Sequence, residues 1–450
     1  MIMKKRIALF LAALLVAQTL VGCGANGGAG KTNSDNTQKA EGETNLSWDE
    51  IKATIPEELK GTTVKFYNWN GVNDVPGAQK AIDQFTKETG IKVEYIQEDY
   101  YDYATTLATK IASDESPDIV RLRDLDPAII KMLKPLGEVD YDFSDQAWDH
   151  DAMYQYQFNG NQYAVALDNT PYFQPLIMYY NKSLVSQFGL EDPYQLWKDG
   201  KWTWDKCMEL TSTFLSKAGD QYYGMSMVTG SDYAYSLGTS FISYEPEKNQ
   251  YVSHMEDATL VKGWQYVAQN VKKGLIMEEI YRNNDFESGL LLFFNDASIS
   301  ARTTHFNFRH FKKQGTLGTV PMPSVEGQDT YYQMLLENEA YGIAAGSKNP
   351  LGAAYFLRFF LDSAHYDMDT FYCDAQAAEV VEWCQGQKYV TSLDQKIHKD
   401  QYGESLWGIS IKLLETDAAQ INTVLHSYAP VLSSMMTQGN KVITSLKQDE

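Results

Sequence analysis

The sequence predicts an α/β protein with two domains, and three observations carry this prediction. Strand and helix patterns alternate across residues 62–120, which is typical of a parallel sheet with crossover helices. About 400 residues follow the N-terminal segment, which is more than one hydrophobic core usually serves. No second apolar run approaches the roughly eighteen residues that a membrane span needs, so we expect the folded part to be soluble.

Each element of the alternating stretch has a local signal. Apolar and β-branched residues predict strands, and apolar residues on one face that stop at Gly90 or before Ser116-Pro117 predict helices. In chain order the expected elements are a strand at 62–67, a helix containing Ile82 and Phe85, a strand at 91–96, a helix at about 101–113 and a short strand at 118–120. Their order predicts a parallel arrangement of the three strands.

Ligands of such sheets bind beyond the carboxyl ends of the strands. This rule points to Trp69 and Asn70 after the first strand, and to the loop from Arg121 to Asp124 after the third. It also points to Asp168, which follows the apolar run at 163–167. For each charged residue among these, a position in a loop exposed to water is as good an explanation as a role in ligand binding.

The N-terminus has the features of a secretory signal. Lys4, Lys5 and Arg6 precede an apolar run at 7–16 that is too short for a membrane span. The segment Leu20-Val21-Gly22-Cys23 resembles the end of a bacterial lipoprotein signal. This resemblance implies a signal peptide at 1–22, acyl chains such as palmitate on Cys23, and attachment to the extracytoplasmic face of the cell membrane. Residues 23–45 are expected to form a flexible tether, because they lack apolar side chains.

The net charge argues against nucleic acid as a partner. The full chain carries a formal charge of −21, and the three basic residues at 4–6 leave with the signal peptide. A nucleic-acid-binding protein needs a basic surface, which this composition does not supply. The segment 22–27 matches G-x-G-x-x-G, but it does not follow a strand, so it predicts no nucleotide site.

The cysteines predict neither a disulfide framework nor a metal centre. Cys207, Cys373 and Cys384 remain once Cys23 is set aside, and an odd number fits no framework. Cys373 and Cys384 lie in a stretch, 371–385, expected to be helical, which would separate them by roughly 16 Å. A bond between them would require a break in that helix. The spacings of nearby histidines fit no usual zinc pattern.

Several segments in the middle of the chain resemble, in order, those of extracellular solute-binding proteins of sugar-uptake ABC transporters. Ala166 and Leu292-Phe293 depart from the usual residues of that family. The matching segments are Pro117-Asp118-Ile119, residues 159–166, Met178–Leu184 with its Tyr-Tyr-Asn-Lys, Gly200–Asp205 with its Trp-Thr-Trp-Asp, residues 286–299 and residues 341–350.

The resemblance implies a periplasmic-binding-protein-like fold of type II. In that fold each of two lobes is a mostly parallel sheet flanked by helices, and the ligand binds in the cleft between them. On this template lobe one would hold residues 46–168 with 322–340, and lobe two would hold 172–318 with 343–450. Pro171 and Pro321-Met322-Pro323 fall near the expected crossings, where proline restricts the backbone.

The same resemblance implies a ligand-capture role for an ABC importer, with the permease as partner and a carbohydrate as ligand. We expect a monomer without cofactor or metal. A sugar site needs aromatic faces and planar polar groups, and by position in the family pattern the ligand-binding residues would be Trp69, Asn70, Arg123, Asp124, Asp168, Tyr233, Arg302, Thr304, Glu337 and Asn338. Arg302 and Thr304, after an expected strand at 297–301, stand where the family often has Trp, so an acidic sugar is an alternative ligand.

Other functions remain open at this point. The same fold would also bind a polyamine, a peptide or an anion, and a structural lipoprotein would not close around a ligand. A surface glycosidase using Asp124 and Asp168 is the enzymatic alternative. The chain contains neither G-x-S-x-G nor H-E-x-x-H, so we predict that it is not an enzyme.

Four residues of the matching segments and the adjoining helices have plain structural explanations. Thr203 is expected to cap a helix, and Trp204 and Trp264 to lie in the core. Asn181 begins a formal glycosylation sequon, yet a turn between a strand and a helix explains it better.

Overall fold

The computed structural model describes residues 46–73, 75, 77–99, 102–122, 130–145, 147–148, 150–153, 156–166, 174–245, 247–280, 282–303, 305, 307–337, 340–363, 372–390 and 406–446. The expected signal peptide, the tether and Cys23 lie outside these ranges. Within them, no helix combines the length and the apolar character that a membrane span requires.

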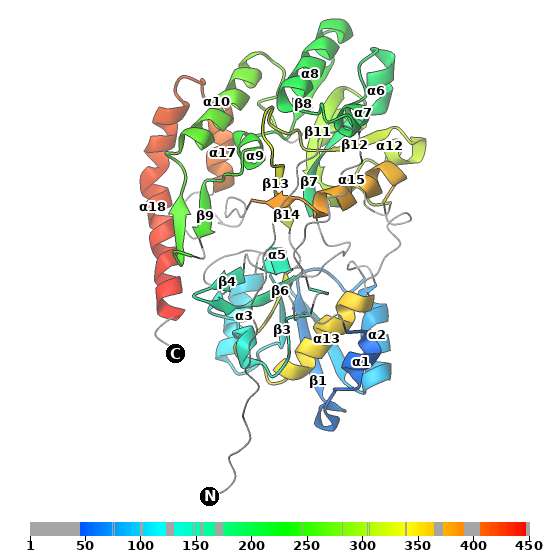
Figure 1. Cartoon of the computed structure of the whole chain (residues 1–450), viewed down its shortest axis with the longest axis vertical. Helices are drawn as coiled ribbons and strands as arrows, with labels where there is room; N and C mark the ends of the chain where they lie inside the picture. Colours follow the sequence, from blue (N-terminus) through cyan, green and yellow to red (C-terminus); the bar gives the residue numbers. More distant parts are fainter. Residues whose placement is uncertain are drawn as a thin grey trace, which may run out of the picture. The chain divides into compact units, whose positions relative to one another are not determined.

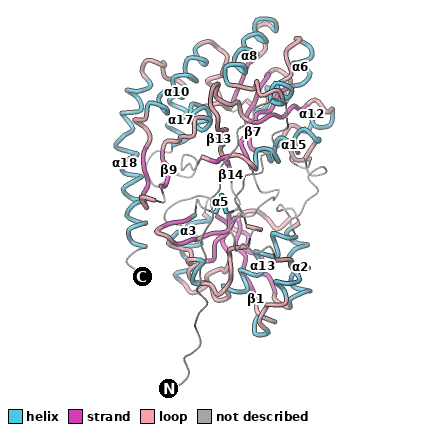
Figure 2. The backbone as a smooth tube through the Cα atoms, in the orientation of Figure 1, coloured by secondary structure: helices cyan, strands magenta, loops and turns pink. Residues whose placement is uncertain are grey.

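The first lobe is built on a five-stranded sheet with the order β2-β1-β3-β15-β6. Both β2 and β3 run parallel to β1, as the sequence predicts, whereas β15 runs antiparallel to β3 and to β6. The strands are β1 (Thr63–Asn68), β2 (Lys92–Gln97), β3 (Ile119–Leu122), β6 (Ala164–Ala166) and β15 (Ala340–Ile343). Figure 2 shows these strands in magenta among the helices.

Successive side chains of β1 point to opposite faces of this sheet. Val64 and Phe66 pack with Phe85 of α2 and Phe356 of α13, whereas Tyr67 packs with Leu107 of α3. The helices and short turns of this lobe are α1 (Trp48–Lys52), η1 (Glu57–Leu59), α2 (Ala78–Thr89), α3 (Tyr103–Ala112), η2 (Leu136–Glu138), α5 (His150–Met153) and α13 (Pro350–Ser363), with a hairpin of β4 (Gln157–Phe158) and β5 (Asn161–Gln162).

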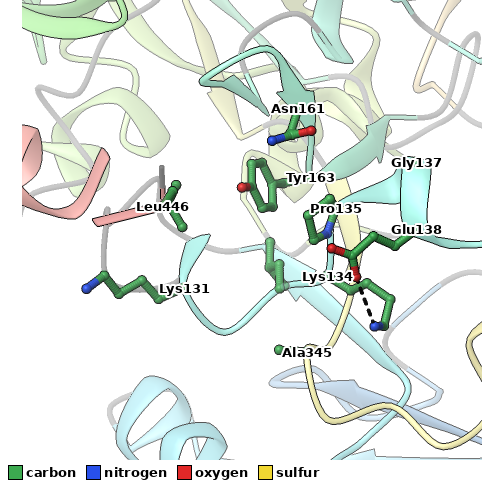
Figure 3. Close-up of a pocket in the computed structure, with 10 residues that line it drawn as sticks. Lys131, Lys134, Pro135, Gly137, Glu138, Asn161, Tyr163, Ala345 and Leu446 are labelled. Carbon is green, nitrogen blue, oxygen red and sulfur yellow. Dashed lines mark hydrogen bonds and ion pairs between the residues drawn. The ribbon is translucent and has the colours of Figure 1, made fainter. Parts of the chain in front are cut away.

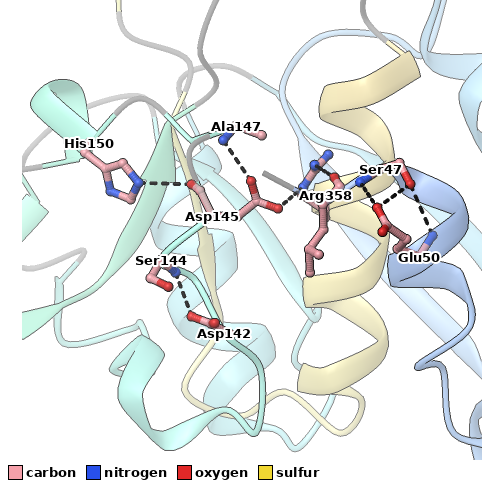
Figure 4. Close-up of polar contacts among 9 residues, drawn as sticks. Ser47, Glu50, Asp142, Ser144, Asp145, Ala147, His150 and Arg358 are labelled. Carbon is pink, nitrogen blue, oxygen red and sulfur yellow. Dashed lines mark hydrogen bonds and ion pairs between the residues drawn. The ribbon is translucent and has the colours of Figure 1, made fainter. Parts of the chain in front are cut away.

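Arg358 of α13 forms a buried ion pair with Asp145 and also bonds the start of the described chain. The Nε of Arg358 donates to the Oδ2 of Asp145 over 3.1 Å, and the two side chains are 2% and 5% exposed. Arg358 also donates through Nη2 to the carbonyl oxygen of Leu46, and Ser47 caps α1 beside it. Figure 4 shows these contacts.

The second lobe contains a sheet with the order β12-β7-β11-β8, and β14 also pairs with β7. The neighbours β11 and β8 pair in parallel, whereas β7 runs antiparallel to β11, β12 and β14. The strands are β7 (Gln174–Asn181), β8 (Tyr223–Ser226), β11 (Leu291–Ala297), β12 (Leu317–Pro321) and β14 (Leu335–Glu337). In each sheet all strands but one therefore run in the same direction, so both sheets are mostly parallel, as expected, with β15 and β7 as the opposed strands. β7 follows β6 of the first lobe, and β15 follows β14 of the second lobe. Neither opposed strand is therefore reached through a crossover helix of its own lobe.

Helices and two small ribbons complete the second lobe (Figure 1). The helices and turns are α6 (Lys182–Gln187), α7 (Pro193–Lys198), α8 (Trp204–Ala218), α9 (Gly230–Ser236), α10 (Ala258–Lys272), α11 (Asn283–Glu287), η4 (Ser298–Ala301), α12 (Arg309–Gln314), α15 (Ala375–Gln385), α17 (Leu406–Leu414) and α18 (Ile421–Leu446). The ribbons pair β9 (Ile242–Glu245) with β10 (Gln250–Ser253), and β13 (Tyr332–Gln333) with β16 (Lys388–Tyr389).

The strand pairings differ from the expected division of the chain at two places. β15 belongs to the first sheet and α13 packs against it, although residues 343–450 were expected in lobe two. β14 pairs with β7 of the second sheet, although 322–340 were expected in lobe one. The reason is that Pro321 is not a crossing: it ends β12, and its carbonyl accepts a hydrogen bond from the indole of Trp202 in the same lobe.

The predicted caps, buried tryptophans and free cysteines are confirmed, whereas one predicted helix is shorter than expected. The hydroxyl of Thr203 caps α8, and Asn181 ends β7 and caps α6 through its side-chain oxygen. Trp204 and Trp264 are buried. Cys207, Cys373 and Cys384 are free thiols. Cys373 precedes α15 instead of lying inside it, so the helix is shorter than expected.

Close packing at Gly230 gives a test of this core. A Cβ atom at Gly230 would lie 2.1 Å from the ring of Trp264, which is itself fully buried. Gly230→Ala is therefore expected to lower the free energy of unfolding by about 1–3 kcal/mol, because the indole must move. Urea denaturation measures the change.

The matched control is Gly137→Ala, where an added Cβ would meet nothing within 4 Å. We expect that variant to keep the stability of the parent protein. Equal stability of the two variants would contradict the packing described for Gly230.

Candidate functional site

The carboxyl ends of β1 and β3 bring an aromatic ring and two planar polar groups together. Asn68 ends β1 and Trp69 follows it, while Arg121 lies near the end of β3. The guanidinium carbon of Arg121 is 4.0 Å from the ring centroid of Trp69, and its Nη1 donates to the Oδ1 of Asn68 over 3.2 Å. Trp69 and Asn70, both predicted from the sequence, therefore belong to one cluster.

Tyrosines behind the cluster fix its backbone. The hydroxyl of Tyr103 bonds the carbonyl oxygens of Arg121 and Tyr67, at 2.9 and 3.0 Å. Its ring meets that of Trp69 edge-on, with centroids 5.2 Å apart, and burial raises the pKa of Tyr103 well above its usual value. Tyr95 donates to the carbonyl oxygen of Asn70. Trp69 is thus held in place while part of its surface stays exposed.

Asn68 adds a hydrogen-bond donor at this strand end. Its side chain is fully buried, and its Oδ1 accepts from both Arg121 and the backbone nitrogen of Asn70. In the described part of the chain its Nδ2 has no hydrogen-bond partner. A buried donor without a partner is costly unless a ligand or water satisfies it. The cluster is therefore suited to a ligand that offers hydroxyl oxygens.

The sequence prediction of site residues did not select Asn68 or Arg121. Arg121 opens the candidate loop 121–124, of which the family pattern indicates Arg123 and Asp124 instead. The signal available in the sequence is position: Asn68 is a polar residue that follows the aromatic pair Phe66-Tyr67 at the end of β1. Asparagine is mostly exposed in proteins, so its burial at a strand end makes it a candidate for a site, beside its role as acceptor for the backbone of Asn70.

Most of the other predicted residues fall where their positions are not described. Arg123, Asp124, Asp168, Thr304 and Asn338 lie outside the described residues, as does the lipidation residue Cys23. Of Glu337 only the backbone is described, and it pairs with Gln174 in the second lobe.

Tyr233 packs inside the second lobe instead of lining a cleft. Its ring stacks on that of Tyr266 with centroids 4.3 Å apart and contacts that of Trp204 at 5.5 Å. It belongs to α9, which is buried on every residue of its length. The apolar surface of a Tyr ring favours such a position as much as it favours a ligand site.

Arg302 lies in a loop of the second lobe that Lys312 holds. The strand expected at 297–301 ends at Ala297, and the turn η4 leads to Arg302. The Nζ of Lys312 donates to the carbonyl oxygens of Ser300, Arg302 and His305, at 3.2, 2.8 and 2.8 Å. Arg302 is 5% exposed, so little of its guanidinium group reaches the surface of the loop.

His305 in this loop is held neutral. Burial, together with the charges of Lys312, Arg302 and Arg309, lowers the pKa of His305 to about 4. The backbone nitrogen of Asn307 donates to its Nδ1 over 3.2 Å. Protonation of that nitrogen would remove the acceptor of this bond, so the geometry opposes the charged form as well.

The lowered pKa of His305 predicts how stability depends on pH. The imidazole of His305 binds a proton near pH 6.5 in the unfolded chain and only near pH 4 in the folded chain. The contribution of His305 to the free energy of unfolding is therefore fully present above about pH 6.5 and is lost as the pH drops toward 4. Replacing His305 with Gln is expected to remove this part of the dependence. Urea denaturation at several pH values between 7 and 4 measures it.

Comparing the parent protein with His305→Gln separates the effect of His305 on stability from that of the other titrating groups. Burial raises the pKa of Asp232 to about 6. This shift makes the protein less stable as the pH rises, opposite to the effect of His305, but it is the same in the parent protein and in His305→Gln. Parallel stability curves for the parent protein and His305→Gln would contradict the prediction.

A pocket of about 500 Å³ lies on the first lobe beside the end of α18 (Figure 3). Tyr163, Leu133 and Ala345 form part of its wall, and Leu446 of α18 reaches it. Lys134 pairs with Glu138 at its edge. None of the residues that line it was predicted as a site residue. In the described ranges, no group of three or more His, Cys, Asp or Glu side chains is placed to hold a metal ion.

Comparisons with known proteins identify what this arrangement is similar to. A family model described as bacterial extracellular solute-binding protein matches residues 80–371. A search of curated proteins found no match. Among solved structures, the extracellular solute-binding protein of Staphylococcus aureus in complex with maltose has 14% identity and a TM-score of 0.61, over 85% of this chain and 98% of that one.

Two further structures give the same result. The apo form of RafE from Streptococcus pneumoniae has 17% identity and a TM-score of 0.59, over 84% of this chain and 99% of that one. An ABC substrate-binding protein of Listeria monocytogenes in complex with cycloalternan has 17% identity and a TM-score of 0.54, over 86% and 99%. At these identities the likeness concerns the fold.

Proposed function

Because the chain belongs to the bacterial extracellular solute-binding proteins, we propose that it is the ligand-capture component of an ABC importer for an oligosaccharide. It binds the sugar in the cleft between its lobes and delivers it to the permease. Acyl chains on Cys23 hold it at the outer face of the membrane. It is a monomer and performs no covalent chemistry.

The cluster at the carboxyl edge of the first sheet carries this proposal. Trp69 offers an aromatic surface for the C–H face of a pyranose, the buried guanidinium of Arg121 stacks on its ring and holds it, and Asn68 is a planar donor beside it. Planar donors suit pairs of neighbouring hydroxyl groups. The buried cation of Arg121 also disfavours a polyamine as ligand.

The similar structures support the sugar assignment. The protein from Staphylococcus aureus was solved with maltose, and that from Listeria monocytogenes with cycloalternan. Maltose and cycloalternan are both saccharides. The two proteins that bind them share the fold of this chain over most of its length. Closure of the two lobes around such a ligand selects one arrangement, which the permease recognises.

Thermal unfolding with a panel of ligands tests the function. The protein is prepared from Gly24 onward and heated with neutral and acidic mono- and oligosaccharides, polyamines and peptides. A ligand at about 100 times its dissociation constant adds about 2.7 kcal/mol of stability, which raises the melting temperature by a few degrees.

The expected result is a rise that is specific to one class of oligosaccharide, with the sugar recovered intact. A rise with a polyamine or a peptide alone would overturn the carbohydrate assignment. Cleavage of the sugar would overturn the assignment as a binding protein.

A further inference from the structure

A second pocket lies on the second lobe, between α7 and α15. Its volume is about 390 Å³, and its walls are formed by Trp197 and Lys198 of α7 and by Glu379, Glu382 and Trp383 of α15. Figure 1 shows the two helices near each other. None of the residues predicted for the cleft contributes to it.

The two tryptophans of this pocket are not core residues. Trp148, Trp202, Trp204 and Trp264 are buried, whereas Trp197 and Trp383 are only partly covered. Exposed tryptophan surface is unfavourable in water, so two such rings at one place call for an explanation.

Neighbouring side chains hold both rings in fixed orientations. Their centroids are 5.4 Å apart, and the ring planes make an angle of 75°. Tyr331 supports Trp383 from behind at 4.8 Å, and Tyr194 packs against Trp197 at 5.5 Å. A ligand would meet a preformed corner of two aromatic surfaces, with little loss of side-chain freedom on binding.

The remaining walls are charged and ordered. The carboxylate of Glu379 accepts hydrogen bonds from the ammonium of Lys198 and from the hydroxyl of Tyr194. These bonds lower the pKa of Glu379, so it stays ionised. Glu382 stands beside it on the exposed face of α15. With two carboxylates and one ammonium, the pocket carries a net negative charge.

The combination of rings and charges indicates the ligand. The core of a protein interface is depleted of charged residues, whereas three of the five side chains that line this pocket are charged. Its volume lies in the range of small-molecule sites, about 300–1,000 Å³. Aromatic surfaces beside carboxylates and an ammonium suit a molecule with both C–H faces and hydroxyl groups.

We infer that the pocket between α7 and α15 is a second saccharide site, contained within one lobe and separate from the cleft. It takes one or two residues of a neutral or amino sugar, and its negative charge excludes uronic acids. This inference goes beyond the proposed function and does not depend on which ligand the cleft binds.

Fluorine NMR of the full-length protein labelled with fluorotryptophan tests the inference. Trp197→Phe and Trp383→Phe assign the two resonances while keeping an aromatic ring against Tyr194 and Tyr331. The probes are maltotriose, chitotriose in its amino form and trigalacturonic acid, each at millimolar concentration. We expect the first two to shift both resonances in a saturable manner, and the acidic sugar to leave them unchanged.

Variants separate this site from the cleft and from effects on folding. Trp383→Ala is expected to weaken binding at the pocket at least ~5-fold, with the Trp69 resonance responding to ligand as before. Glu382→Gln, on the exposed face of α15, is expected to weaken binding of the amino sugar more than that of maltotriose. Trp69→Ala is expected to leave the pocket unaffected.

Absence of any saturable shift at Trp197 and Trp383, with all three sugars, would overturn the inference. So would shifts that disappear in Trp69→Ala, because the pocket would then only report on the cleft. A shift confined to the pocket, with no response at Trp69, would support the second site.

Discussion

Replacing Trp69 with Ala is expected to weaken binding of the oligosaccharide about 10- to 30-fold. The exposed part of its ring is the aromatic surface at the end of β1, and Arg121 and Tyr103 hold that ring in place. Its loss removes the stacking surface and frees the guanidinium of Arg121 from its position. Isothermal titration calorimetry with the sugar identified by thermal unfolding measures the change.

Trp48→Ala is the matched control for this experiment. Trp48 is also a partly covered tryptophan of the first lobe, but it packs on Phe359 and donates to Glu88, away from the strand ends. We expect this variant to lose stability and keep its affinity. Unchanged affinity in Trp69→Ala, or an equal loss in both variants, would remove Trp69 from the binding site.

Replacing Arg358 with Ala is expected to lower the free energy of unfolding by about 3–5 kcal/mol. The substitution leaves the carboxylate of Asp145 buried without its cation, and it removes the bond to the carbonyl oxygen of Leu46. A buried charge that has lost its partner is strongly destabilising, even where the intact pair adds little. Urea denaturation followed by circular dichroism measures this loss.

The control uses an ion pair on the surface. Lys60 and Glu57 pair at 2.6 Å, but their side chains are 52% and 83% exposed. Lys60→Ala is expected to change the stability by less than about 1 kcal/mol, because water screens such a pair. A similar small loss in Arg358→Ala would mean that Asp145 finds another partner or solvent.

Local patterns predicted the parts of the fold that depend on neighbouring residues. The strands around Val64 and Ile119 follow from short apolar runs, and the caps at Thr203 and Asn181 follow from hydroxyl and amide chemistry at helix starts. These features need no knowledge of distant segments. The rule that ligands bind at the carboxyl ends of strands also points to Trp69, which the structure places in the cluster with Arg121.

Pairings between distant segments were not predictable in the same way. Whether residues 335–337 join the first or the second sheet depends on which strand they meet, and their own composition suits both. Tyr233 of α9 illustrates the same limit for the site, because a tyrosine ring fits a core as well as a cleft. The role of Arg121 does not follow from its own segment, because its burial depends on Asn68 at the end of β1 and on Trp69 directly after it.

The place of β15 in the first sheet has a consequence for biosynthesis. Its partners β3 and β6 leave the ribosome long before it, and until it arrives both present an unpaired edge. The N-terminal lobe therefore cannot complete its fold during synthesis of its own segment. A chain that stays unfolded until late is what a secretion channel for extended polypeptides requires, so the interleaved topology favours export before folding.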